Sequence, residues 1–138
     1  MPFSGLSHVS LTVRDLNRSC AWYTDVLEWR EQVRGRSDTT SFAHGVLPGG
    51  LSIVFREHDQ GIGDPFDETR PGLDHISMSV ETLDDLDKLE RSLARVGAEF
   101  TATRELPFGW LLAFRDPDNI ALEAMLGRPA TRKEGDHD

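Results

Sequence analysis

The segment LSHVSLTV (Leu6–Val13) recurs in altered form as LDHISMSV (Leu73–Val80). His8 of the first copy falls on His75 of the second, an offset of 67 residues. A register that continues from a strand into the next helix predicts that the chain contains two copies of one structural unit. The same offset aligns apolar residues in the segments that follow: Leu16 with Leu83, Trp22 with Leu89, Val26 with Leu93 and Trp29 with Val96.

The composition is typical of a soluble globular protein, with 38% hydrophobic and 28% charged residues. A chain of 138 residues has room for one ordinary domain or for two small halves that share a core. No apolar run is long enough to cross a bilayer, and the first residues do not resemble a signal peptide. The net charge of −9 disfavours nucleic acid as a partner. The single cysteine, Cys20, fits a reducing cytoplasm.

The first copy predicts a strand, a helix and three further strands. His8–Val13 alternates between polar and apolar residues, as a half-buried strand does. Asp15 or Asn17 is expected to cap a helix that reaches about Glu28. The later strands are expected over Glu31–Arg36, Thr39–Val46 and Leu51–Phe55.

The second copy predicts the same order, so each half reads as βαβββ and the fold class is α+β. We expect one domain over 1–126, with module one at about 5–57, a Gly- and Pro-rich linker at about 58–71 and module two at about 72–126. The polar tail, 127–138, is expected to be disordered. The predicted elements of module two are a strand His75–Val80, a helix Thr82–Val96 ending at Gly97, and strands Glu99–Thr103, Gly109–Arg115 and Ile120–Met125.

Two histidines and one glutamate form a candidate metal site. Packing of the two copies about a pseudo-twofold axis would bring His8 and His75 together on the concave face of the sheet, opposite the helices. Ile120 and Leu122 belong in the core, so Glu123 points to the same face as the histidines. An inward carboxylate is costly unless it is paired or metal-bound. Two imidazoles and one carboxylate make a facial triad for a divalent metal, whereas the structural alternative is two satisfied histidines and a solvent-facing glutamate.

These motifs resemble the vicinal-oxygen-chelate superfamily, which includes glyoxalase I, extradiol dioxygenases, methylmalonyl-CoA epimerase, fosfomycin-modifying enzymes and bleomycin-binding proteins. The resemblance implies two βαβββ modules in a cupped mixed sheet, with His8, His75 and Glu123 as metal ligands and Glu123 as the catalytic candidate. It implies one divalent ion, and the ligand types allow Fe²⁺, Mn²⁺, Zn²⁺ or Ni²⁺. The matching segments are Ser7–Val13, Trp22–Tyr23, Leu27–Trp29, Gly72–Ile76 and Phe114–Glu123.

One position departs from glyoxalase I, which carries a second glutamate on the last strand of its first module. Here the positions that face the site on that strand are Ser52, Val54 and Arg56, and none is acidic. This argues against a glyoxalase I reaction, and the remaining three-ligand set resembles that of the dioxygenases.

Two residues are candidates for substrate binding. Arg56 lies in the site-facing register and would hold an anionic group, although a solvent-exposed arginine is the alternative. Trp110 would form a pocket wall, with core packing as the alternative.

The sequence thus predicts a metal-dependent lyase, isomerase or dioxygenase acting on a small oxygen-rich molecule. The alternative is a non-catalytic drug-binding protein of the bleomycin-resistance type. The resemblance implies a homodimer in either case.

Overall fold

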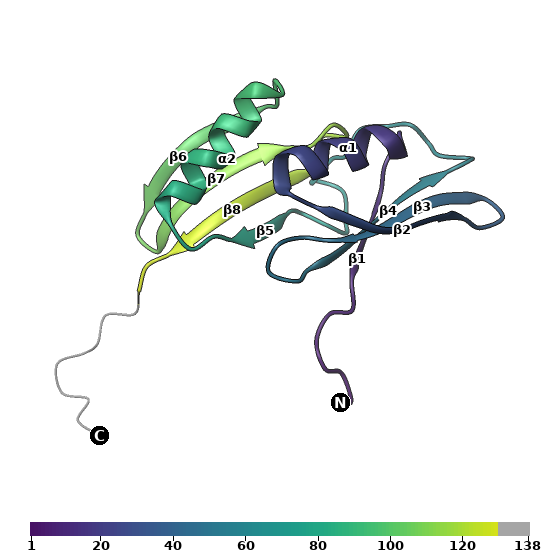
Figure 1. Cartoon of the computed structure of the whole chain (residues 1–138), viewed down its shortest axis with the longest axis horizontal. Coiled ribbons are helices and arrows are strands. Elements are labelled where there is room, and N and C mark those ends of the chain that lie inside the picture. The colour runs from purple at the N-terminus through teal and green to yellow at the C-terminus, as the bar shows by residue number, and fades with distance from the viewer. Residues whose placement is uncertain (130–138) are drawn as a thin grey trace.

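The computed structural model describes residues 1–129 and consists of two βαβββ modules (Figure 1). The predicted α+β class and tandem repeat are confirmed. The predicted tail lies outside the described residues except for 127–129, where strand β8 ends at Gly127. Module one contains β1 (Val9–Thr12), α1 (Leu16–Leu27), β2 (Arg30–Arg36), β3 (Thr40–Val46) and β4 (Ser52–His58). Module two contains β5 (Ile76–Ser79), α2 (Leu83–Arg95), β6 (Phe100–Leu106), β7 (Gly109–Arg115) and β8 (Ala121–Gly127).

The strands predicted to form one cupped mixed sheet form two separate four-stranded sheets, one in each module. Their strand orders are β1-β4-β3-β2 and β5-β8-β7-β6, so the repeat extends to strand pairing. In each module the first strand runs parallel to the last, and the other pairs are antiparallel. Strands β1 and β5 therefore each lie at a sheet edge, with one side of the backbone open to another strand.

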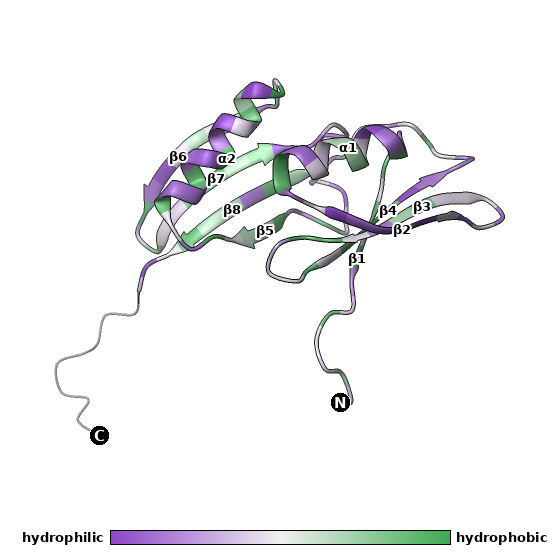
Figure 2. Cartoon of the chain, viewed as in Figure 1, coloured by the Kyte–Doolittle hydropathy of each residue, from purple (hydrophilic) through white to green (hydrophobic). Residues whose placement is uncertain are grey.

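Both helices begin at predicted caps. The Asp15 side chain accepts a hydrogen bond from the N–H of Arg18, and Thr82 and Asp85 form a reciprocal capping box at α2. Gly97 follows α2 with a φ of 70°, a left-handed conformation that glycine adopts at helix ends. Along both helices the colouring alternates between hydrophilic and hydrophobic residues, as expected when one face packs on a sheet (Figure 2).

The two modules share one hydrophobic core, which includes Phe55 from module one and Leu112 from module two. Trp29 is 1% exposed, and its Nε1 donates a hydrogen bond to the carbonyl of Ile53 at 3.1 Å. The indole lies against Gly45, where a Cβ atom would come within 2.3 Å of the Trp29 ring. Position 45 therefore requires glycine, because both the ring and the neighbouring backbone are fixed.

We expect the substitution Gly45→Ala to lower the free energy of unfolding by about 1–3 kcal/mol, because the new methyl group overpacks the core. Urea denaturation measures the loss. Gly127→Ala is the matched control, since nothing lies within 4 Å of its added Cβ and its stability should change by less than about 0.5 kcal/mol. Equal stability of the two variants would contradict the assigned packing.

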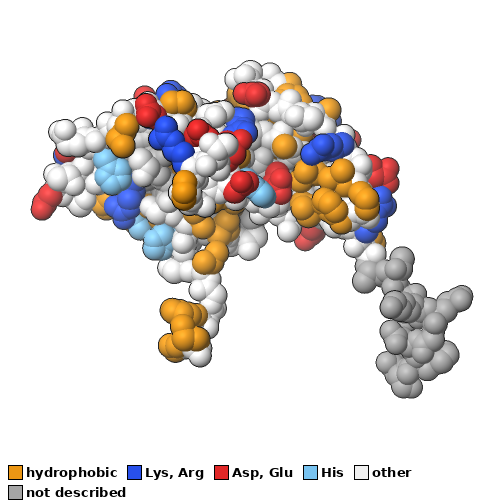
Figure 3. Space-filling model, turned by 180° about the vertical axis from the view of Figure 1, so that it is seen from behind, with side chains coloured by type: hydrophobic (Ala, Val, Ile, Leu, Met, Phe, Trp, Pro, Cys, Tyr) orange, Lys and Arg blue, Asp and Glu red, His pale blue; other side chains and the backbone are white. Residues whose placement is uncertain are grey.

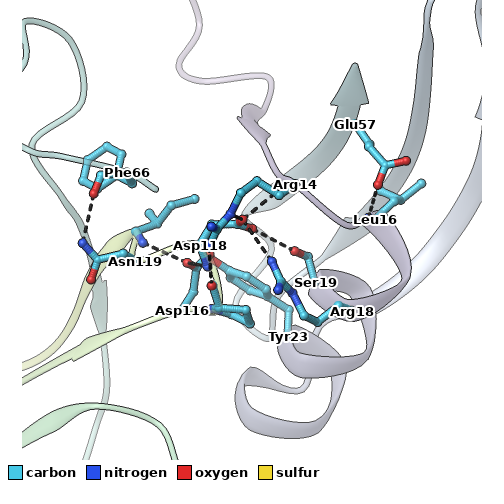
Figure 4. Close-up of polar contacts among 12 residues, drawn as sticks. Arg14, Leu16, Arg18, Ser19, Tyr23, Glu57, Phe66, Asp116, Asp118 and Asn119 are labelled. Atoms are coloured by element: carbon cyan, nitrogen blue, oxygen red, sulfur yellow. Dashed lines mark hydrogen bonds and ion pairs between the residues drawn. The ribbon is translucent and has the colours of Figure 1, made fainter. Parts of the chain in front are cut away.

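A buried polar contact joins α1 to the turn between β7 and β8 (Figure 4). The Tyr23 hydroxyl donates to Asp116 Oδ2 at 2.8 Å. Oδ1 of Asp116 accepts from the backbone N–H groups of Asp118 and Ile120, both at 2.8 Å. Asp116 is 6% exposed, and burial raises its pKa, although these hydrogen bonds oppose the rise. The contact connects the two modules through one carboxylate.

Asp118 makes a second connection from the same turn. It is 3% exposed, and its Oδ1 accepts from Arg14 Nε at 2.7 Å and from Arg18 Nη2 at 3.1 Å. Ser19 Oγ donates to its other oxygen at 3.3 Å. Two acids of module two are thus compensated by side chains of module one, and this arrangement fixes the relative orientation of the modules. We refer to the contacts of Asp116 and Asp118 with module one as the module lock.

We expect Tyr23→Phe to destabilise the fold by about 1–3 kcal/mol, because it leaves the buried Asp116 without its side-chain donor. Chemical denaturation followed by circular dichroism measures the change. Lys88→Ala, which removes an exposed ion pair with Asp84 on α2, is the control and should leave stability unchanged. A Tyr23→Phe variant as stable as this control would show that the hydroxyl contributes nothing to the module lock.

Candidate metal centre

The module-two half of the site lies on the face of its sheet away from the helices. His75 directly precedes β5, and Glu123 pairs with Ser77 in the parallel register of β5 and β8. Leu122 is buried in the core, so the neighbouring Glu123 faces the opposite way, as predicted. His75 Nε2 is 3.3 Å from Glu123 Oε1, and the glutamate side chain is 18% exposed. Two predicted ligands are therefore adjacent.

The other nitrogen of the His75 ring also faces a carboxylate. Nδ1 lies 2.6 Å from Oδ1 of Asp74. This bond is the main reason that the pKa of His75 is raised, and Glu123 adds to the effect while partial burial opposes it. The imidazole is thus held between two acids, one at each ring nitrogen.

The module-one half of the site is formed by the strand edge at His8. The Ser7 hydroxyl lies 3.0 Å from His8 Nδ1, and the His8 side chain is exposed. The ring of His44 on β3 lies 6.3 Å from the His8 ring, centroid to centroid. His44 was not among the sequence candidates, although it alternates with the fully buried Ala43 and so shares a face with its pairing partner Val54.

Arg56 extends this face beyond the two histidines. Its guanidinium lies 5.3 Å from the centre of the Phe42 ring, which is its pairing partner on β3. Among residues 1–129, Arg56 makes no ion pair. The adjacent Glu57 faces the other way and accepts from the N–H of Leu16 at 3.1 Å. Arg56 therefore has no carboxylate within this range that would neutralise its charge.

A second arginine on the concave side is already neutralised. Arg115 of β7 forms a bidentate pair with Glu68 of the linker, at 2.7 and 2.9 Å, which lowers the pKa of Glu68 to about 2. The linker is further anchored to the β7–β8 turn, because the Phe66 N–H donates to the carbonyl of Asp118 at 2.8 Å. The charge of Arg115 serves this anchor and is not free for a ligand.

Trp110 lies on the wrong face for the predicted pocket wall. It pairs with Leu126 on β8 and alternates with Leu111, so it shares the helix side of the sheet with Leu112. Its ring packs against the core and is covered by the guanidinium of Arg128, 4.6 Å from the ring centre. The pocket-wall prediction for Trp110 is therefore wrong, and the core-packing alternative is correct. Trp110 does not contribute to the face that carries Glu123.

Within one chain the structure brings His75 and Glu123 together and leaves His8 apart. Across residues 1–129, no three His, Cys, Asp or Glu side chains form a group suited to hold a metal ion. Figure 3 shows histidine side chains at separate places over one side of the molecule. An imidazole nitrogen beside a carboxylate oxygen is a suitable donor pair for the metals considered above, so the half-site fits a metal but lacks the third ligand.

Residues 5–124 match the sequence model of the Glyoxalase/Bleomycin resistance protein/Dioxygenase superfamily. The chain belongs to this family. It is 75% identical to a glyoxylase/bleomycin resistance protein/dioxygenase domain from Frankia sp. EAN1pec, whose crystal structure has a TM-score of 0.89. That match covers 91% of this chain and 99% of the Frankia chain. The predicted superfamily is thereby confirmed.

More distant members of the fold include fosfomycin resistance proteins. A mutant of FosX from Listeria monocytogenes, complexed with Mn(II) and 1S,2S-dihydroxypropylphosphonic acid, is 25% identical over 91% of this chain and 92% of its own, with a TM-score of 0.72. FosX from Mesorhizobium loti is 21% identical over 91% and 94%, with a TM-score of 0.71. No protein of curated function matches significantly. Within the described part of the chain, no helix is suited to span a membrane.

Proposed function

We propose that the chain is a metal-dependent enzyme whose metal centre forms between two copies of itself. His8 of one copy would complete the triad with His75 and Glu123 of the other. The observation that carries this proposal is the division of the ligands: two are adjacent in module two, and the third lies at the repeat-equivalent place in module one. Each histidine directly precedes an edge strand, β1 or β5, that has an open side.

The module lock favours pairing between chains over pairing within one. Joining β1 to β5 of the same chain would require the modules to move apart from their contacts at Asp116 and Asp118, which would expose or orphan two buried carboxylates. A twofold axis that places β1 of one copy beside β5 of the other leaves the lock intact. Such an isologous interface produces two identical sites in a homodimer.

His8, His75 and Glu123 would hold the metal and leave positions open for water and substrate. When bound, a divalent ion acts as a Lewis acid that polarises substrate oxygens. Glu123 would hold the metal next to the substrate and is our candidate for proton transfer with that substrate. Arg56, oriented by Phe42 and free of acidic partners among residues 1–129, would hold an anionic group. These roles suit a lyase, isomerase or dioxygenase of a small, oxygen-rich anion.

Hybrid dimers provide the test of the shared site. We expect Mn²⁺ titration to give one site of native affinity per chain in the native protein, and no site of that affinity in His8→Ala or Glu123→Ala. A hybrid of these two variants should recover one site per dimer, because one combination of halves is intact. A hybrid of His75→Ala with Glu123→Ala is the matched control and should recover none, since both changes damage module two. No recovery in the first hybrid would place all three ligands in one chain or refute the triad.

The role of Arg56 has a separate test. We expect Arg56→Ala to weaken binding of 1S,2S-dihydroxypropylphosphonic acid to the Mn²⁺-loaded protein about 10- to 100-fold, because a charge-assisted hydrogen bond is lost. This compound combines neighbouring oxygens with an anion, and it accompanies Mn(II) in the FosX mutant described above. Arg91→Ala, an arginine change on α2, is the control. Calorimetry measures both, and Mn²⁺ affinity should stay unchanged in each. Equal weakening in both variants would remove Arg56 from the site.

A further inference from the structure

The residue that precedes each candidate metal-binding histidine contacts that histidine's Nδ1. In module one the contact is from Ser7 Oγ to His8 at 3.0 Å, and in module two it is from Asp74 Oδ1 to His75 at 2.6 Å. The two contacts are related by the 67-residue repeat but are formed by different side chains. The residue at this repeated position therefore contacts the same ring nitrogen in both modules.

The chemistry of the module-two contact selects one form of the ring. A carboxylate accepts hydrogen bonds, so the proton of a neutral His75 lies on Nδ1 when that atom is bonded to Asp74. The lone pair then lies on Nε2, which faces Glu123 Oε1 at 3.3 Å. These two atoms are the donors that a metal requires, and a hydrogen bond at the far nitrogen also makes the imidazole a stronger ligand.

The module-one contact constrains the tautomer of its histidine less than the module-two contact does. A serine hydroxyl can donate or accept, so Ser7 orients the His8 ring without selecting a tautomer. The side chain of Asp74 is 75% exposed, and its bond to His75 is its only hydrogen bond among residues 1–129. The hydroxyl of Ser7 bonds only to His8 within the same range.

We infer that Asp74 and Ser7 are positioning residues of the metal centre, which hold His75 and His8 with Nε2 directed to the metal, and that Asp74 makes module two the stronger half-site. The inference rests on the proposed function, because it concerns the same triad. It implies an order of assembly: the ion would bind first to His75 and Glu123, which already face each other, and His8 of a second copy would complete the site.

The test compares Asp74→Asn with Asp84→Asn, a variant with the same charge change on the exposed side of α2. We expect Asp74→Asn to weaken Mn²⁺ binding about 10- to 100-fold, as loss of an outer hydrogen-bond partner does, with unchanged thermal stability. Asp84→Asn should bind Mn²⁺ as the native protein does. Ser7→Ala should have a smaller effect than Asp74→Asn, and Asp74→Glu should recover part of the affinity.

A second measurement does not depend on metal. Long-range ¹H–¹⁵N NMR of the metal-free protein, at a pH where the ring is neutral, should show His75 protonated at Nδ1 and should show a mixture of tautomers in Asp74→Asn. An unchanged tautomer together with native Mn²⁺ affinity would overturn the inference. If no variant and no native protein binds Mn²⁺ while the tautomer still changes, the positioning contact stands and the proposed metal centre fails.

Discussion

Two buried carboxylates in one turn constrain the architecture of this chain. Asp116 and Asp118 project from the β7–β8 turn of module two toward module one, where Tyr23 and Ser19 of α1, together with Arg14 just before this helix, compensate them. Buried acids are tolerated only where such partners are in place, so the modules adopt the orientation that provides them. The separation of the two sheets, the open edges of β1 and β5, and the division of the candidate ligands all follow from that orientation.

The sequence predicted the helices and strands well, because hydrophobic periodicity is a local signal and the repeat shows most elements twice. The alternation around Glu123 placed it correctly opposite Leu122, and Thr82 capped α2 as expected. The faces of strand β7 were harder to predict, because Trp110 and Leu111 are both apolar. The sequence of a strand that is buried on both sides does not show which residues face the helices. The same ambiguity concealed His44, which shares its face with apolar neighbours. Strand β6 also runs to Leu106, three residues past its predicted end.

The arrangement of the modules could not be predicted from the same signals. The segment Asp116–Asn119 has the composition of an ordinary turn, and nothing local indicates that its acids contact a helix about a hundred residues earlier. The residues of the candidate site could therefore be predicted from the sequence, because alternation along a strand shows which face each residue occupies. Whether they meet within one chain or between two depends on the module lock, which only a three-dimensional arrangement reveals.

The duplicated unit is not duplicated in its chemistry. Ser10 on β1 pairs with the aliphatic Val54, whereas its counterpart Ser77 on β5 pairs with Glu123. A cup built from these two faces has near-symmetrical walls but a carboxylate on one side only. A substrate seated between these faces would meet the acid from a single side, because only one of the two repeat-related pairs carries a carboxylate. The two copies of one fold therefore present different chemistry at equivalent places on their sheets.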